Sequence, residues 1–92
     1  MFQCPFPGCR TRTRTLYGLR NHYVAMHGMK YCPVCNREYR DLLKHLSEAA
    51  KKCWDHLILY GLLAKIYRGK GSNVEFTKMA REIAEEFLWV EE

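Results

Sequence analysis

The arrangement of two cysteines and two histidines near the N-terminus constrains this chain more than any other feature. Four residues separate Cys4 from Cys9, and twelve more lead to His22. Four residues then separate His22 from His27, which is about one helical turn. A tight turn can bring two thiolates to one side of a tetrahedral Zn²⁺, and one face of a helix can bring two imidazoles to the other side. The spacing therefore predicts a structural zinc site.

The composition indicates why a metal would be needed. The 92 residues can form one small domain or two or three smaller units. Before residue 46 the chain has few large aliphatic residues, but it has four cysteines and three histidines. Units shorter than about 40 residues rarely fold without a metal or disulfide bonds. We therefore expect the first half of the chain to depend on metal for its stability.

The cysteine pattern also favours a reducing compartment. The chain has five cysteines, an odd number, and four of them form two close pairs, Cys4/Cys9 and Cys32/Cys35. The N-terminus lacks the apolar segment of a signal peptide. The longest apolar stretch, 57–66, is interrupted by a tyrosine, a glycine and a lysine, so it is not expected to span a membrane. We expect an intracellular protein, in the cytoplasm or in the nucleoid or nucleus, with thiolates free to bind zinc.

The residues around the first motif resemble those of the Cys2His2 zinc-finger family. Phe2 lies two residues before the first cysteine, and Leu19 lies three residues before the first histidine, where this family places core residues. Thr15 is a suitable N-cap for a helix over 16–26, which Gly28 would end. The resemblance covers residues 2–27 and implies a β-hairpin followed by a helix.

One position departs from the family pattern. The family usually has a large aromatic residue four positions after the second cysteine, and this chain has Thr13 there. We expect Phe6, Leu16 or Tyr17 to fill the space instead. The departure affects packing rather than the metal ligands.

The resemblance also implies contact with double-stranded DNA, because this family lays its helix in the major groove. The matching positions include Gly18, which has no side chain to read a base, and Asn21, which could pair with adenine. Nearby arginines suit phosphate contacts, which give affinity without sequence information. The candidate nucleic-acid contacts are Arg10, Arg12, Arg14, Thr15, Tyr17, Arg20 and Asn21.

A second, atypical site follows. Cys32 and Cys35 form a Cys-x2-Cys knuckle, and His45 follows after nine residues rather than twelve. The fourth ligand is ambiguous between Cys53 and His56. In an unbroken helix Cys53 would lie about 12 Å along the axis from His45, which is too far to share one zinc.

We therefore expect the helix to break within 50–54. Asp55 could then cap a following helix and place His56 in its first turn, pointing back at the site. Thiolate is the stronger zinc ligand, which argues for Cys53. We favour His56 and keep Cys53 as the alternative. The long spacing between the histidines, followed by a leucine-rich helix, is similar to fingers of some archaeal and archaeal-virus proteins.

The last third of the chain predicts two helices. Apolar residues recur at helical spacing over 57–66 and again over 75–89. The simplest interpretation is a helical hairpin that buries its own apolar faces. The first helix is apolar nearly all round, so a homodimer through the C-terminal helices is a further hypothesis. The apolar residues that exceed what the hairpin can bury, and that would form the dimer contact, are Leu59, Tyr60, Leu63, Leu88 and Trp89.

These observations predict a small zinc-stabilised α+β protein. Residues 1–28 would form a Cys2His2 zinc finger and 29–56 a second finger packed against it, followed by a helical hairpin over 57–92. We expect two structural zinc ions. Their predicted ligands are Cys4, Cys9, His22, His27, Cys32, Cys35, His45 and His56, with Cys53 as the alternative to the last.

The charge distribution favours nucleic acid as the partner. Residues 1–37 carry six basic residues and no acidic one, whereas residues 73–92 carry two basic and six acidic residues. We expect a DNA-binding protein, in the first instance a transcriptional regulator. The alternatives are a zinc-stabilised protein-interaction module and an RNA-binding protein. An enzyme is not expected, because the predicted sites are closed by four protein ligands and no catalytic constellation stands near them.

Overall fold

The computed structural model describes residues 1–64 and 74–91. The helices and strands, in chain order, are β1 (Phe2–Gln3), β2 (Arg12–Thr13), α1 (Leu16–His27), β3 (Tyr31–Cys32), β4 (Arg37–Glu38), α2 (Leu42–Ala49), α3 (Trp54–Leu63) and α4 (Val74–Leu88). Two short antiparallel hairpins are therefore each followed by a helix, as the sequence predicts. The turn expected between the last two helices, at 68–73, lies outside the described residues.

The first hairpin–helix unit is closed at both ends by local sequence. Phe2 pairs with Thr13 across β1 and β2. The Thr15 hydroxyl accepts a hydrogen bond from the Gly18 N–H at 2.9 Å and so caps α1. Gly28 ends the helix at a φ of 78°, a conformation that glycine adopts without strain. The predicted cap and stop residues are confirmed.

The second hairpin–helix unit is shorter. Asp41 caps α2 by accepting a hydrogen bond from the Lys44 N–H at 3.1 Å. The helix ends at Ala49 and α3 starts at Trp54, so the predicted break lies where expected. The prediction that Asp55 caps α3 is wrong: Cys53 occupies the N-cap position, without a side-chain cap. Asp55 instead lies in the first turn, where its charge suits the positive end of the helix dipole.

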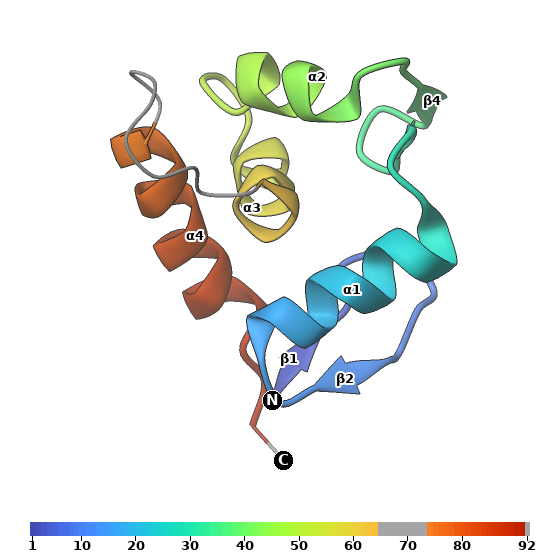
Figure 1. The fold of residues 1–92 in the computed structure, drawn as a ribbon, viewed down its shortest axis with the longest axis vertical. Coiled ribbons are helices and arrows are strands. Elements are labelled where there is room, and N and C mark those ends of the chain that lie inside the picture. Colours follow the sequence, from blue (N-terminus) through green and yellow to red (C-terminus); the bar gives the residue numbers. More distant parts are fainter. Residues whose placement is uncertain (65–73, 92) are drawn as a thin grey trace.

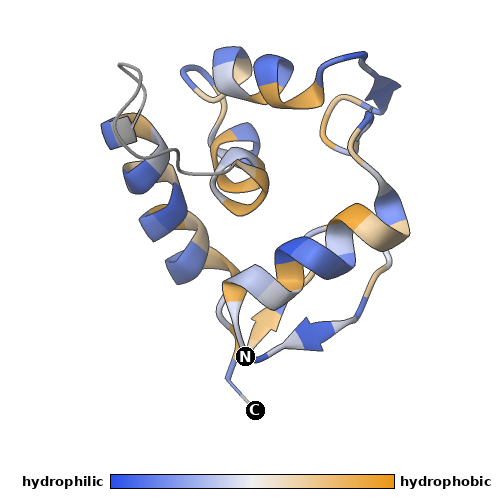
Figure 2. Ribbon diagram, in the orientation of Figure 1, coloured by the Kyte–Doolittle hydropathy of each residue, from blue (hydrophilic) through white to orange (hydrophobic). Residues whose placement is uncertain are grey.

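Helix α3 lies at the centre of the molecule, with α4 and α2 on two of its sides and α1 on another (Figure 1). It contacts all three of these helices, which explains why it has no polar face. Figure 2 shows it as predominantly apolar, whereas α4 presents hydrophilic residues on its outer side. The core of the described residues is thus built around one ten-residue helix.

The surplus apolar surface that the sequence indicated is largely covered within one copy. Leu59, Tyr60, Leu63 and Leu88 are all buried, because the fingers and α4 together enclose α3. Trp89 stays half-exposed but packs edge-to-face on Phe2, with ring centroids 5.2 Å apart. Four of these five side chains are therefore covered within one copy, and the homodimer stays a prediction.

The residues after α4 return to the first hairpin. Phe2 and Trp89 form an antiparallel bridge. The Val90 N–H also donates to the Met1 carbonyl at 2.7 Å. The C-terminal helix is consequently attached to β1 as well as to α3.

Helices α3 and α4 approach each other closely at Gly61. A Cβ placed there would lie 2.0 Å from the Ala80 carbonyl oxygen and 3.0 Å from the Ala84 Cβ. Ala80 and Ala84 are themselves fully buried. Three small residues therefore allow the two helices to pack backbone against backbone. One turn away, the buried Tyr60 and Thr77 hydroxyls share a hydrogen bond at 3.1 Å.

We predict that Gly61→Ala destabilises the protein, because the added methyl group can be accommodated only by moving α4. The expected loss is about 2–3 kcal/mol, which is typical of overpacking. Thermal unfolding of the zinc-loaded protein measures the change. Met79→Ala, next to Ala80 but half-exposed, is the matched control and should leave the melting temperature nearly unchanged. An unchanged melting temperature for Gly61→Ala would contradict the close helix contact.

Candidate metal centres

The first candidate metal centre joins the first hairpin to α1. The turn between β1 and β2 supplies Cys4 and Cys9, and the last part of α1 supplies His22 and His27. One ligand atom from each residue lies within 4.8 Å of all the others. The Cys4 Sγ is 3.5 Å from the His27 Nε2, and the Cys9 Sγ is 3.3 Å from the His22 Nε2. Two sulfurs and two imidazole nitrogens thus converge on one point.

The second candidate metal centre joins the second hairpin to two helices. Cys32 and Cys35 come from the knuckle, His45 from α2, and His56 from the first turn of α3. The Cys35 Sγ lies 3.5 Å from the His45 Nε2 and 3.2 Å from the His56 Nε2. The structure therefore gathers His56 into this cluster. Cys53, the N-cap residue of α3, is half-buried and belongs to neither of the two clusters found among the described residues.

Both clusters fit zinc. Two thiolates and two imidazoles are a common structural ligand set for this ion, with tetrahedral geometry. Bond lengths of about 2.3 Å to sulfur and 2.0 Å to nitrogen place neighbouring ligand atoms about 3.5 Å apart in a tetrahedron. The observed sulfur–nitrogen separations, 3.2–3.5 Å, match that value. With four protein ligands, such sites are structural, and no ligand position remains for a substrate.

Aromatic rings orient one histidine in each centre. Phe6 stacks on His27 with ring centroids 3.9 Å apart and an interplanar angle of 4°. Tyr39 stacks on His45 at 3.7 Å and 10°. Phe6 therefore supplies the aromatic side chain that is missing at the position of Thr13. Tyr17, another candidate for this role, is 73% exposed and does not fill the space.

The surroundings of the ligands set their protonation. A backbone hydrogen bond from Thr11, helped by His22, lowers the pKa of Cys9 to about 6, which favours the metal-binding thiolate. Burial raises the pKa of Cys4 to about 11 and also raises that of Cys32, so these two thiols rely on a bound cation to lose their protons. Burial, with His45 nearby, lowers the pKa of His56 and keeps its ring in the neutral, ligating form.

His56 differs from most metal-bound histidines in its outer nitrogen. Its Nδ1 is buried and has no hydrogen-bond partner among the described residues. Metal-ligating imidazoles usually donate this second N–H to a carbonyl or a carboxylate. The orientation of the His56 ring is therefore held by packing within the buried start of α3, since no second hydrogen bond fixes it.

Most predicted nucleic-acid contacts are solvent-exposed. They follow the β2 segment and the outer side of α1. The exposed set comprises Arg10, Arg12, Arg14, Thr15, Tyr17 and Asn21. Arg12 also donates to the Gln3 side chain at 3.3 Å. The hydroxyl of Thr15 is engaged in capping α1.

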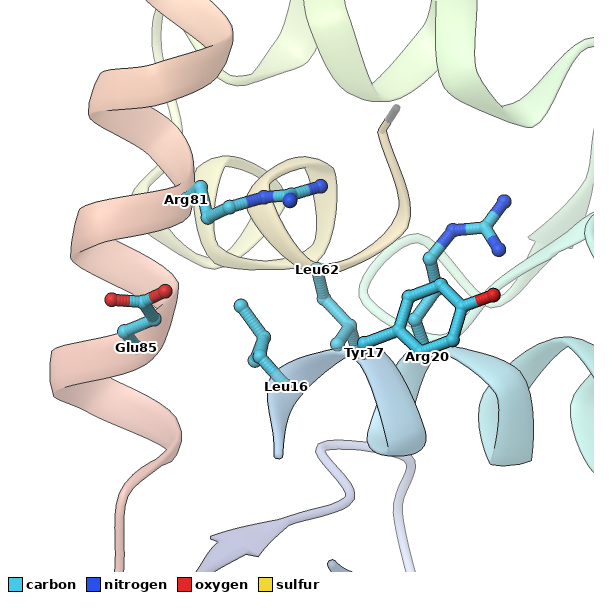
Figure 3. Close-up of a pocket in the computed structure, with 6 residues that line it drawn as sticks. All are labelled: Leu16, Tyr17, Arg20, Leu62, Arg81 and Glu85. Carbon is cyan, nitrogen blue, oxygen red and sulfur yellow. The ribbon is translucent and has the colours of Figure 1, made fainter. Parts of the chain in front are cut away.

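Arg20 has a structural contact that the sequence did not reveal. Its Nε donates to the Leu63 carbonyl at 3.1 Å, and Arg81 donates to the Ala64 carbonyl at 2.8 Å. Figure 3 shows these two side chains extending from α1 and α4 towards the end of α3, around a pocket also lined by Tyr17 and Glu85. The last carbonyls of a helix carry partial negative charge, so two guanidinium groups there stabilise the C-terminus of α3.

Comparison with known proteins identifies no relative of this chain. No family model, no curated protein and no solved structure matches the chain. What the fold and the sites define is a small α+β domain with two Cys2His2 clusters that could bind two zinc ions. None of the helices in the described part of the chain is long and apolar enough to cross a membrane.

We predict that His56→Ala lowers bound zinc from two ions to one per chain, because it removes a ligand of the second cluster. Cys53→Ala should leave both ions in place and is the matched control, since Cys53 is three residues before His56 in the chain and is not part of either cluster. Zinc released on denaturation, counted with a chromogenic chelator, measures both variants. A loss of zinc in Cys53→Ala with none in His56→Ala would exchange the roles of the two residues.

We also predict that Arg20→Ala destabilises the fold by about 1.5–3 kcal/mol, the usual value of a hydrogen bond to a charged group. Arg12→Ala, an exposed arginine of the same finger, should change stability by less than about 0.5 kcal/mol. Thermal unfolding of the two zinc-loaded variants compares them. Equal melting temperatures would show that the contact with Leu63 contributes little.

Proposed function

We propose that this protein binds double-stranded DNA as a two-zinc member of the Cys2His2 finger class and acts as a transcriptional regulator. The exposed α1 side chains and the Arg10–Arg14 run would make the contacts, mostly with phosphates. The two metal ions would be structural. The observation that carries the proposal is the concentration of exposed positive charge on the fingers.

The arrangement of charge supports this proposal. Arg10, Arg12 and Arg14 are exposed on one hairpin, and Lys30 and Arg37 are exposed on the connection to the second finger and on β4. No acidic residue interrupts residues 1–37. A surface of this kind attracts a polyanion and releases its counterions on binding.

The exposed face of α1 offers limited base recognition. Asn21 is exposed and has the side chain that pairs with adenine in the major groove. Gly18 presents nothing to a base, and the Thr15 hydroxyl is already engaged as the helix cap. We therefore expect affinity to come mainly from phosphate contacts and to depend weakly on sequence.

Two other functions remain candidates. An exposed apolar surface around Trp54 and Phe87 favours a protein-interaction module, because both rings are half-exposed. RNA binding through stacked tyrosines is less well supported. The tyrosines among the basic residues of the fingers are Tyr17, Tyr23 and Tyr31; Tyr23 is fully buried, Tyr31 is partly buried and Tyr17 is widely exposed.

The test is fluorescence anisotropy of the zinc-loaded protein on a duplex of arbitrary sequence, titrated with salt. We predict that Arg12→Ala and Arg14→Ala each weaken binding to all sequences and reduce the salt slope by about one per lost phosphate contact. Lys78→Ala removes the same charge from an exposed position on α4 and should leave binding unchanged. Absence of binding at low salt would reject the DNA proposal and favour the protein-interaction module.

A further inference from the structure

The two metal centres differ at the outer nitrogens of their histidines. The His56 Nε2 lies 3.2 Å from the Cys35 Sγ, so Nε2 is the ligand atom and the ring proton belongs on Nδ1. That Nδ1 is buried and has no partner among the described residues. His22, His27 and His45 are partly exposed, and no ring nitrogen of theirs is buried without a partner in this part of the chain. His56 thus differs from the other three ligand histidines in leaving a buried donor unpaired.

This difference bears on metal affinity. A metal-bound imidazole normally donates its second N–H to a carbonyl, a carboxylate or water, which orients the ring and makes it a better ligand. Loss of such a partner typically weakens metal binding by about 10–100-fold. Because the buried His56 Nδ1 lacks one, we expect the second centre to bind zinc more weakly than the first by a factor in this range.

The two centres also differ in how the chain assembles them. All four ligands of the first centre lie within residues 4–27, and one helix, α1, supplies both histidines. In the second centre His45 comes from α2 and His56 from α3, and the helices are separated by a break at 50–53. Helices of eight and ten residues are too short to be stable alone. The second centre therefore requires two short helices to keep their positions, whereas the first requires one hairpin and one helix.

The first turn of α3 lacks the side-chain cap that begins α1 and α2. Thr15 caps α1 and Asp41 caps α2, each by accepting a hydrogen bond from a backbone N–H. Cys53 occupies the corresponding position of α3 and forms no such bond. The first N–H groups of a helix have no intrahelical partner, so an uncapped start is the weaker end. Coordination through His56 would hold the turn that no cap holds.

We propose that the second metal centre is a zinc-responsive switch. As zinc becomes scarce, the second centre loses its ion while the first centre keeps its own. The first turn of α3 is then released from the knuckle that carries Cys32 and Cys35. Because α3 packs on α1, α2 and α4, this release reaches both fingers and the C-terminal helix. Such a response of the fold to zinc does not depend on DNA binding.

Stepwise chelation of the zinc-loaded full chain tests the order of release. At each chelator concentration, bound zinc is counted, accessible thiols are alkylated, and mass spectrometry locates the label. When one of the two ions has been removed, we expect label on Cys32 and Cys35 and protection of Cys4 and Cys9. The first pair to lose protection should do so at about 10–100-fold higher free zinc than the second. Cys53→Ala removes the one cysteine outside both clusters and should give the same order.

Hydrogen exchange on the same samples tests the change in α3. With one ion removed, the amides of α3 should lose protection while those of α1 keep theirs. His45→Ala removes the ligand from α2, leaves the sequence of α3 unchanged, and should give the same pattern without chelator. The wild-type titration needs no variant, so misfolding of a variant leaves the test intact. Release of the first centre's ion before or together with that of the second overturns the proposal, and so does loss of the second ion with α3 still protected.

Discussion

The position of His56 in the first turn of α3 is the constraint on which the rest of this structure depends. A metal bound to that imidazole, with Cys32, Cys35 and His45, would fix the start of α3 to the second finger. The other end of α3 is fixed by Arg20 and Arg81, which bind its last carbonyls. Between these ends the helix packs on α1, α2 and α4. One helix therefore connects both fingers to the C-terminal segment, and its position follows from coordination at one end and charge at the other.

This arrangement changes how a chain of 92 residues is stabilised. Independent fingers bury little apolar surface each and rely on their own metal. Here the fingers share a core, because Leu19 and Tyr23 of α1, Leu46 of α2 and Leu62 of α3 belong to one buried cluster. Each metal site, when occupied, would consequently stabilise more than its own hairpin. Loss of coordination at the second centre would release the start of α3, and with it the surface on which α1 and α4 pack.

Much of this could be read from the sequence, because the relevant signals are local. Ligand spacing predicted the hairpin–helix units, and Thr15 and Gly28 marked the ends of α1. The break before α3 followed from the distance that an unbroken helix would impose. The rest depends on contacts between distant segments. The approach of Gly61 to Ala80 and the bond from Arg20 to Leu63 leave no local pattern. From the sequence, Phe6, Leu16 and Tyr17 could each fill the space of the aromatic side chain that is missing at Thr13. Only the stacking of Phe6 on His27 in the folded chain identifies Phe6 as the residue that does so.

The fixed relation of the fingers to α4 also bears on how a nucleic acid could approach. Charge is unevenly divided between two parts of the chain: residues 1–37 carry no acidic residue, whereas exposed glutamates lie along α4 and just after it. Because α3 holds these parts together, the molecule presents a lasting electrostatic polarity. If the protein binds DNA as proposed, the polyanion would be attracted to the hairpin side and repelled from α4, which would restrict its orientation before any base is contacted. Orientation by charge would compensate for the few base-reading side chains on α1, where Asn21 is exposed and Gly18 offers none.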